Sequence, residues 1–200
     1  MIYVSHRVNT IEELKKVKSN FGVEVDLRSY KNQLILHHDP FESGENFETW
    51  LDHYNNKFLI LNIKEEGLEQ RIIDLMKKYK ISNYFFLDQS FPFLIKYKNL
   101  CSGRTAIRVS EYESVETALT LAGEIKWIWL DCFSSFPIDS KTYKLLKEAN
   151  YKLCLVSPEL QGRLGENEIL SMINYMKSND IAIDAVCTKV PDYWAKVFER

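Results

Sequence analysis

Short apolar runs rich in β-branched and aromatic residues alternate with amphipathic stretches along the whole chain. Runs of about 4–8 such residues are typical of strands, and apolar positions three or four apart are typical of helices. We predict strands at Ile2–His6, Gly22–Leu27, Phe58–Ile63, Tyr84–Leu87, Thr105–Val109, Trp127–Asp131, Lys152–Val156 and Ala185–Thr188. Helices are predicted between them, at Ile11–Ser19, Asn46–Asn55, Gly67–Tyr79, Ser90–Tyr97, Ser114–Leu121, Ser140–Asn150 and Glu166–Lys177.

The strand sequences favour a parallel sheet that is covered on both faces. The segments 58–61 and 127–130 are apolar at every position, as parallel strands between two layers must be. Eight strands that alternate with helices close naturally into a (β/α)8 TIM-type barrel, for which 200 residues is near the lower limit. An open doubly wound sheet is the rival, and the lack of a glycine-rich first turn counts against it.

Composition narrows the class of protein. The 200 residues are 46% hydrophobic and show no linker-like break, so we predict a single domain over residues 1–200. Lys and Arg number 26 against 28 Asp and Glu, which is no footprint for nucleic acid. No apolar run reaches the roughly 18–20 residues of a membrane span, and no signal sequence is recognisable, so we expect a cytoplasmic protein. The four cysteines are widely spaced and are predicted to be buried thiols.

Two carboxylates interrupt the second predicted strand. Glu24 and Asp26 lie two positions apart, so their side chains share one face, roughly 6–7 Å apart. Ionised carboxylates that close repel each other, and a divalent cation such as Mg²⁺ or Ca²⁺ removes this cost. A basic partner, Arg7 or Lys64, or a solvent-facing edge strand explains the same pair without a metal.

Three of the four histidines lie within the first 38 residues, at the ends of strand-like runs. A single histidine at a strand end is usually structural. Two that converge beside a carboxylate pair suit proton transfer, because the imidazole titrates near neutral pH. His6 is one candidate, and the sequence leaves His37 and His38 open as the second, with the adjacent Asp39 favouring His38.

These residues, in this order, resemble the glycerophosphodiester phosphodiesterase family of the phospholipase C-like phosphodiesterase superfamily. The likeness extends from residue 6 to about residue 191 and is most specific in the first 64 residues. In that family an antiparallel hairpin follows the second strand, which explains an additional apolar run, Gln33–His37, as its return strand. The matching motifs are His6-Arg7, Asn9-Thr10, Glu24-x-Asp26, His38-Asp39 and Asn62-x-Lys64.

The resemblance implies a metal-dependent hydrolase that acts on a small glycerol- or sugar-linked phosphodiester. His6 and His38 would be the general base and the general acid of the reaction. The divalent cation would be held by Glu24, Asp26 and Asn62. Arg7 and Lys64 would bind the phosphate, with Arg108, at the end of the fifth strand, as a further anion binder or else a partner of Asp88 or Asp131.

The sequence departs from the family pattern at the third strand, where Asn62 replaces the usual carboxylate and weakens cation binding. The segment 39–57 is too short for the usual substrate-capping insertion, so the site is either open or completed by a second subunit. These departures keep two other functions under consideration. One is a catalytically lapsed barrel that binds a phosphorylated ligand or partner, and the other is an aldolase or isomerase of sugar phosphates.

Overall fold

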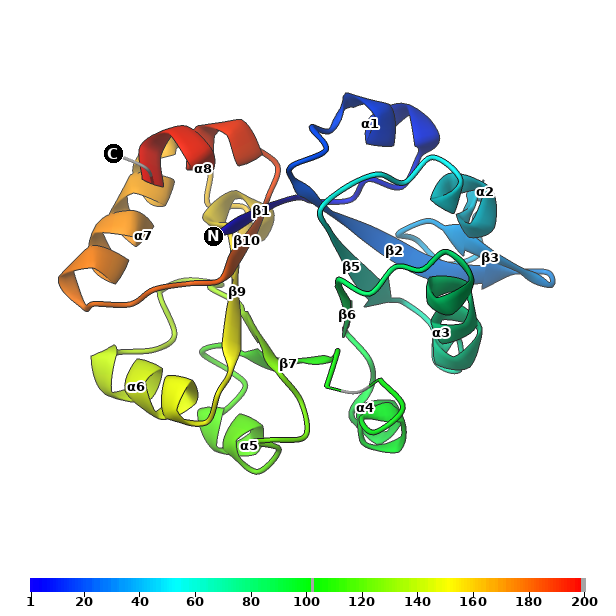
Figure 1. The fold of residues 1–200 in the computed structure, drawn as a ribbon. Helices are drawn as coiled ribbons and strands as arrows, with labels where there is room; N and C mark the ends of the chain where they lie inside the picture. Colours follow the sequence, from blue (N-terminus) through cyan, green and yellow to red (C-terminus); the bar gives the residue numbers. More distant parts are fainter. Residues whose placement is uncertain (102, 199–200) are drawn as a thin grey trace. The chain divides into compact units, whose positions relative to one another are not determined.

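The computed structural model describes residues 1–101 and 103–198, and strands alternate with helices through most of this length (Figure 1). The strands are β1 (Ile2–Ser5), β2 (Gly22–Tyr30), β3 (Gln33–Leu36), β4 (Glu45–Asn46), β5 (Phe58–Ile63), β6 (Tyr84–Leu87), β7 (Ala106–Val109), β8 (Trp127–Leu130), β9 (Lys152–Val156) and β10 (Ala185–Thr188). The helices are α1 (Ile11–Lys16), α2 (Phe47–Leu51), α3 (Glu69–Lys78), α4 (Phe91–Tyr97), α5 (Val115–Leu119), α6 (Ser140–Glu148), α7 (Glu166–Ser178) and α8 (Pro191–Phe198), with a 3-10 helix η1 (Pro158–Gln161).

The chain forms two compact units, which we describe separately. The N-terminal unit comprises Ser5–Thr105, and the C-terminal unit comprises Met1–Val4 and the chain from Ala106 onward. Both units are α/β structures whose strands pair mainly in parallel, as the sequence predicts.

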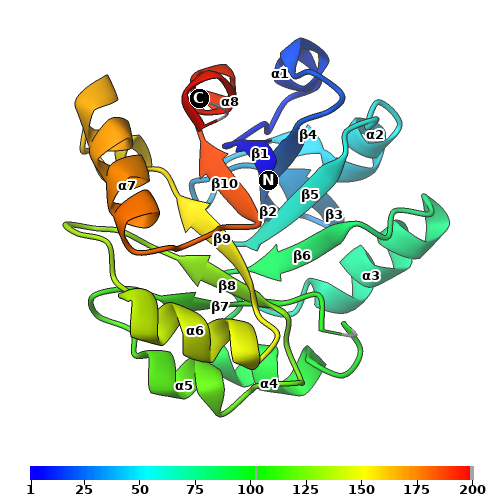
Figure 2. The same ribbon diagram turned by 60° about the vertical axis from the view of Figure 1, so that its left-hand side comes forward.

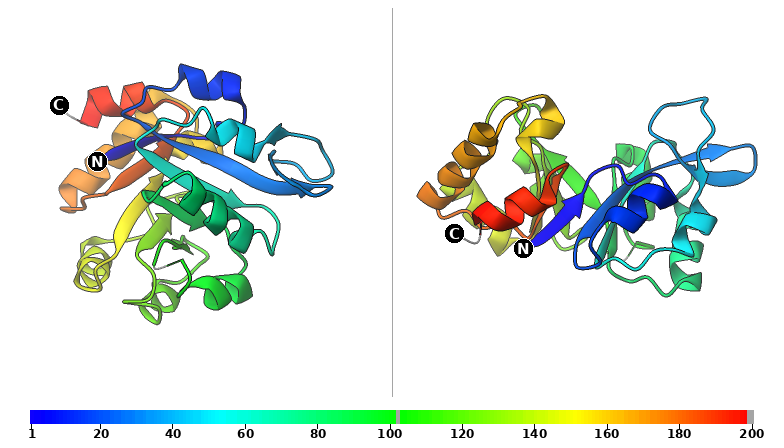
Figure 3. Two further views of the ribbon diagram at one scale, coloured as in Figure 1. Left: turned by 45° about the vertical axis from the view of Figure 1, so that its right-hand side comes forward. Right: turned by 90° about the horizontal axis from the view of Figure 1, so that it is seen from above.

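The sheet of the N-terminal unit has the strand order β4-β3-β2-β5-β6. Strands β2, β5 and β6 are parallel, whereas β3 returns antiparallel to β2 through a turn at Lys31 and Asn32. Lys31 has a φ of 54°, which is the left-handed conformation that such two-residue turns require. The predicted hairpin is therefore confirmed, and Figure 3 shows it extending past the ends of its neighbours.

The two faces of this sheet have different chemistry because side chains alternate along each strand. Leu59, Leu61 and Ile63 of β5 belong to the hydrophobic core that helices α1, α2 and α3 cover. The intervening positions face the other way and include Asn62. The same alternation in β2 sends its valines into the core and leaves Glu24 and Asp26 on the opposite face.

Gly44 keeps the segment after β3 close to that strand. A Cβ atom added at this position would lie 2.3 Å from the main-chain oxygen of Leu36 and 3.1 Å from Cβ of His37. No side chain fits there without displacing β3, so glycine allows the loop to pack directly against the segment that carries the two histidines.

The C-terminal unit has the strand order β1-β10-β9-β8-β7, and helices α5, α6 and α7 lie along one side of it (Figure 2). Helix α8 was not among the predicted helices, although Pro191 at its start is a typical helix-initiating residue. Trp194 of α8 is fully buried, and its indole N–H donates to Ser157 Oγ at 2.7 Å.

The predicted elements are confirmed; most helices are shorter than predicted, whereas β2 continues to Tyr30 and α7 to Ser178. The helix predicted over 46–55 is the most reduced, because Asn46 pairs with Ile35 as part of β4 and its side chain caps α2. The capping box of α1, from Thr10 to Glu13, is present. All four cysteines are buried free thiols, as predicted, and no helix of the described residues has the length and apolar character of a membrane span.

Two loops of the C-terminal unit are joined by one carboxylate. Oε1 of Glu111, after β7, accepts hydrogen bonds from the main-chain N–H groups of Ser134 and Ser135, both at 2.7 Å, in the loop after β8. Its Oε2 accepts from the N–H of Phe133 at 3.2 Å. Partial burial alone would raise the pKa of Glu111, but these hydrogen bonds outweigh it and lower the pKa to about 2.

We expect Glu111→Gln to lower the free energy of unfolding by about 1 kcal/mol at neutral pH, because several charge-assisted hydrogen bonds to a largely solvated group are weakened. A carboxylate with a lowered pKa stabilises the fold above its unfolded pKa near 4.5, and this stabilisation is lost as the pH falls toward about 2. The difference between variant and wild type in urea unfolding should therefore be smaller near pH ~3 than near pH ~7. Glu148→Gln, on an exposed face of α6, is the control; an equal loss at both pH values would contradict the assignment.

Candidate functional site

Three polar side chains from two neighbouring strands of the N-terminal unit come together. Asp26 of β2 and Asn62 of β5 are directly paired in the parallel register, and Glu24 precedes Asp26 on the same face of β2. Glu24 and Asp26 are fully buried, and Asn62 is 6% exposed. The sequence-predicted carboxylate pair and its amide neighbour therefore share one buried position.

Basic side chains surround the carboxylate of Asp26. Nε of Arg7 lies 3.7 Å from Oδ2, and Nζ of Lys64 lies 3.5 Å from Oδ1. Asn9 adds a reciprocal pair: its Nδ2 donates to Asp26 Oδ2 at 2.9 Å, and its Oδ1 accepts from the Asp26 N–H at the same distance. Arg7 and Lys64, which the sequence offered as an explanation of the carboxylate pair that needs no metal, are thus both present beside Asp26.

Glu24 has fewer compensating charges. Its Oε1 accepts from Nδ2 of Asn62 at 2.8 Å, and its Oε2 accepts from the N–H of Arg7 at 2.7 Å. Burial, together with the negative charge of Asp26, raises the pKa of Glu24 to about 7. Such a carboxyl group gains most from a nearby positive charge.

Of the predicted histidines, His6 has its ring beside this pair. Nε2 of His6 lies 3.8 Å from Glu24 Oε2, and its side chain is 15% exposed. His37 and His38 follow β3, where the His37 N–H donates to the main-chain oxygen of Asp26 at 3.0 Å. His38 Nδ1 lies 2.8 Å from Oδ1 of Asp39, whereas Nδ1 of His37 accepts from the Asp39 N–H at 3.1 Å. The ring of His38 is therefore oriented by a carboxylate, while that of His37 is engaged by the main chain.

The structure adds contacts that the sequence did not predict. Asn9 belongs to a recognised motif but had no assigned function. Asp88, which the sequence offered only as a partner of Arg108, directly follows β6 with a φ of 56°. It lies 3.6 Å from Nζ of Lys64, so this lysine contacts one carboxylate within β2 and one just after β6. Arg28 donates to the main-chain oxygens of His38 and Lys64, which ties the hairpin to the end of β5.

Arg108 lies in the other unit and is engaged there. It forms an ion pair with the buried carboxylate of Asp131, and its Nε lies 3.7 Å from Glu113 Oε1. The ion pair with Asp131 is one of the two that the sequence offered for Arg108. Its role as an anion binder stays a prediction.

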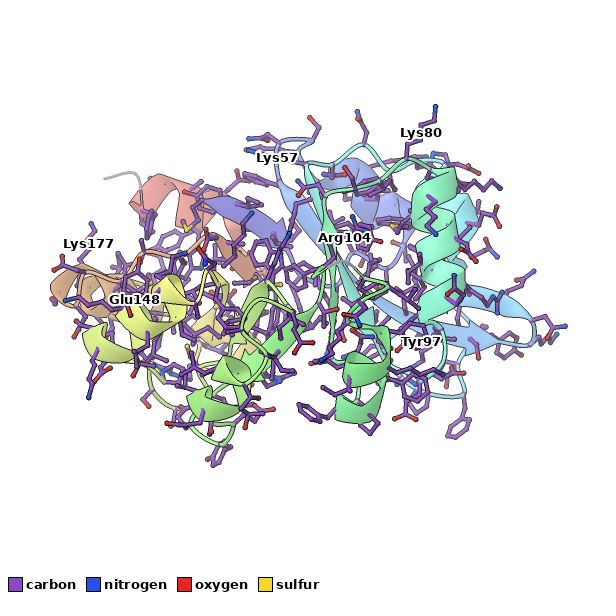
Figure 4. All side chains as sticks on the ribbon, turned by 60° about the horizontal axis from the view of Figure 1, so that its bottom comes forward. Lys57, Lys80, Tyr97, Arg104, Glu148 and Lys177 are labelled. Atoms are coloured by element: carbon purple, nitrogen blue, oxygen red, sulfur yellow. The ribbon has the colours of Figure 1, made fainter. Side chains whose placement is uncertain are left out.

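Several polar atoms within β2, at the carboxyl end of β5 and just after β6 are buried without a hydrogen-bond partner. They are Asp26 Oδ1, Asn62 Oδ1 and Ser90 Oγ. Buried polar atoms are normally hydrogen bonded, so these atoms are available to a bound water, ion or ligand. Figure 4 labels two lysines that mark the other side of this unit: Lys57 lies just before the start of β5, and Lys80 lies just after the end of α3. The atoms described above lie at or after the opposite end of β5.

The oxygen donors fit a hard divalent cation, because Mg²⁺ and Ca²⁺ prefer carboxylate and amide oxygens. Asp26 Oδ1 and Asn62 Oδ1 are buried and have no hydrogen-bond donor. The described residues contain no cluster of three or more His, Cys, Asp or Glu side chains placed to hold a metal. The possible donors are therefore two carboxylates and one neutral amide.

A cavity of about 180 Å³ adjoins this group at the ends of β5 and β6. Its walls include Lys64, which also contacts Asp26, and Ser90. The remaining lining residues are Ile63, Glu65, Glu66 and Asp88. Space for part of a small ligand is thus present next to the buried carboxylates.

Solved structures with a similar arrangement of strands and helices include two glycerophosphodiester phosphodiesterases. One from Agrobacterium tumefaciens matches with a TM-score of 0.70 at 12% identity, over 100% of this chain and 99% of that one. Another, from Parabacteroides distasonis, gives 0.66 at 11% identity over 98% and 86%. The chain has the fold of the glycerophosphodiester phosphodiesterases. This confirms, at the level of the fold, the resemblance predicted from the motifs.

A mutant tryptophan synthase alpha-subunit from Pyrococcus furiosus matches less well, with a TM-score of 0.50 at 11% identity over 98% of this chain and 90% of that one. No family model and no curated protein matches the sequence. At these identities the structural likeness establishes the fold, and the activity must be argued from the site itself.

We expect Asn9→Ala to lower the free energy of unfolding by about 1–3 kcal/mol, because the buried carboxylate and N–H of Asp26 each lose a hydrogen-bond partner. Urea unfolding monitored by tryptophan fluorescence measures this loss. Asn55→Ala, at an exposed position after α2, is the matched control. Equal stability of the two variants would show that Asn9 does not hold Asp26.

The raised pKa of Glu24 makes stability depend on pH when divalent cations are removed by a chelator. The folded state binds the proton more tightly, so the stabilisation is complete below pH ~4.5 and is lost as the pH rises through about 7. The free energy of unfolding should fall by about 3 kcal/mol across this range. We expect Glu24→Gln to remove most of this decline, and a decline of the same size in the variant would contradict the explanation.

Proposed function

We propose that this protein is a metal-dependent phosphodiesterase that hydrolyses a small glycerol- or sugar-linked phosphodiester. The observation that carries the proposal is the group formed by Glu24, Asp26 and Asn62, with His6 on one side and Arg7 and Lys64 next to the carboxylates. The likeness in fold to glycerophosphodiester phosphodiesterases supports it. The proposal includes the closed eight-stranded barrel that the sequence predicts, because in such barrels the active site lies at the carboxyl ends of the strands.

Arg7 and Lys64 would bind the non-bridging oxygens of the phosphodiester. Both lie beside Asp26, which holds their charges at the ends of β2 and β5. A phosphodiester carries one negative charge, and more charge develops on its oxygens in the transition state. Fixed cations therefore stabilise the transition state more than the ground state.

Glu24, Asp26 and Asn62 would hold a divalent cation, Mg²⁺ or Ca²⁺. When bound, such an ion neutralises charge on the phosphate and lowers the pKa of an oxygen nucleophile. The raised pKa of Glu24 supports this ligand set, and so do the buried Oδ1 atoms of Asp26 and Asn62, which accept no hydrogen bond.

His6 and His38 would move the protons of the reaction. His6 would take the proton from the attacking hydroxyl, of water or of the substrate itself, as its oxygen bonds to phosphorus. The bond from phosphorus to the leaving oxygen then breaks, and His38 would donate a proton to that oxygen. The carboxylates of Glu24 and Asp39, next to His6 and His38 respectively, stabilise the protonated rings.

The cavity lined by Lys64 and Ser90 would receive one alcohol arm of the substrate. It contains acceptors such as Glu66 and Asp88, which suit hydroxyl groups. The proposed partner is thus a small, hydroxyl-bearing phosphodiester.

Hydrolysis of bis(p-nitrophenyl) phosphate and of glycerophosphodiesters, with Mg²⁺ or Ca²⁺ and with a chelator, tests this function. We expect His6→Ala and His38→Ala each to lower kcat by about 10²–10⁴-fold, the usual contribution of a general acid or base. His53→Ala, at an exposed position after α2, should keep full activity. Failure of the wild type to turn over any of these compounds with either cation would contradict the proposal.

A catalytically lapsed barrel is the second candidate, and Asn62 is the observation that favours it. An amide in place of a third carboxylate leaves a weaker set of cation ligands. Calorimetry with inorganic phosphate separates the candidates, because phosphate binding without turnover or metal dependence supports the lapsed barrel.

A further inference from the structure

The carboxylates at the proposed site already have partners when no ligand is bound. Arg7 and Lys64 contact Asp26, and Lys64 also contacts Asp88. Glu24 accepts hydrogen bonds from the N–H of Arg7 and from Nδ2 of Asn62. A divalent cation must therefore compete with these groups for its carboxylate ligands.

Asn62 is central to this competition. Its Nδ2 donates to Glu24 Oε1 at 2.8 Å, and its Oδ1 is buried with no hydrogen-bond donor. As an amide it offers a cation one oxygen but adds no negative charge. Oδ1 of the register-paired Asp26 has no hydrogen bond, but Nζ of Lys64 lies 3.5 Å from it. The balance between these basic partners and a cation therefore decides whether Asp26 can act as a ligand.

A bound phosphate would change this balance. Its negative charge pairs with Arg7 and Lys64, which now share their charge with Asp26, and so releases that carboxylate to act as a ligand. Conversely, a bound cation would occupy Asp26 and release the two basic side chains for phosphate. Each ligand removes the competitor of the other, which is the condition for positive coupling.

We propose that Asn62 makes cation binding at this site depend on a bound phosphate, so that the divalent cation and the phosphate bind cooperatively. This inference rests on the proposed function for the identity of the two ligands. It concerns the order and strength of binding, which a binding experiment measures without any turnover.

The test is calorimetric titration of the wild-type protein with Mg²⁺, without phosphate and with saturating inorganic phosphate, corrected for the complex that the two ions form in buffer. We expect phosphate to tighten Mg²⁺ binding by about tenfold or more, within the range usual for coupled sites. The reverse titration, phosphate with and without Mg²⁺, must give the same factor, because coupling is reciprocal.

Asn62→Asp tests the role assigned to the amide. The additional carboxylate should tighten Mg²⁺ binding in the absence of phosphate and reduce the coupling factor, and Mg²⁺ alone should raise the Tm of the variant more than that of the wild type. Asn167→Asp makes the same chemical change on an exposed turn of α7 and should leave both quantities unchanged.

Mg²⁺ binding that is equally tight with and without phosphate would overturn the inference, and so would an unchanged coupling factor in a folded Asn62→Asp variant. Should that variant not fold, the two wild-type titrations decide the coupling by themselves. Hydrolysis of a phosphodiester without coupled binding would refute this inference and leave the proposed function standing. Coupled binding of Mg²⁺ and phosphate without hydrolysis would support this inference and contradict the proposed function.

Discussion

Two carboxylates side by side in the interior of a protein are the central constraint on this structure. Glu24 and Asp26 are fully buried on one face of β2, where ionising both of them is costly. The surrounding chain compensates with Arg7, Lys64 and the amide groups of Asn9 and Asn62. Such an arrangement contributes less to stability than an apolar face would, so its presence is better explained by a ligand than by folding.

The partners of the two carboxylates are uneven. Asp26 is contacted by two basic side chains, whereas Glu24 receives only neutral N–H donors and a histidine that is 3.8 Å away. In the C-terminal unit the strand ends are also polar, but there Asp131 is paired with Arg108 and Gln161, and Ser157 accepts from Trp194. Buried oxygens without a hydrogen bond lie within β2 and at the end of β5, and none is present among the described residues at the strand ends of the C-terminal unit. This difference supports the placement of the proposed site in the N-terminal unit.

Asn62 connects the fold with the proposed chemistry. The parallel register places it opposite Asp26, at the position from which a side chain on β5 reaches the carboxylate pair. A carboxylate here would add charge to a crowded buried site and attract a cation strongly. The amide instead satisfies Glu24 by a hydrogen bond and lowers the net negative charge. This chemistry is consistent with the proposal that a cation and an anionic substrate bind together.

The sequence by itself determined the strands other than β4, most of the helices, and the common face of Glu24 and Asp26. These features follow from local periodicity, which acts between residues close in the chain. The hairpin of β2 and β3 was expected from the family resemblance of the motifs. Only the tertiary structure decided the partners of the charges: that Lys64 lies between Asp26 and Asp88, that Asn9 holds Asp26, and that Arg108 pairs with Asp131. Strand register and packing bring these distant residues within a few ångströms, and no local pattern encodes which of several nearby charges a side chain will meet.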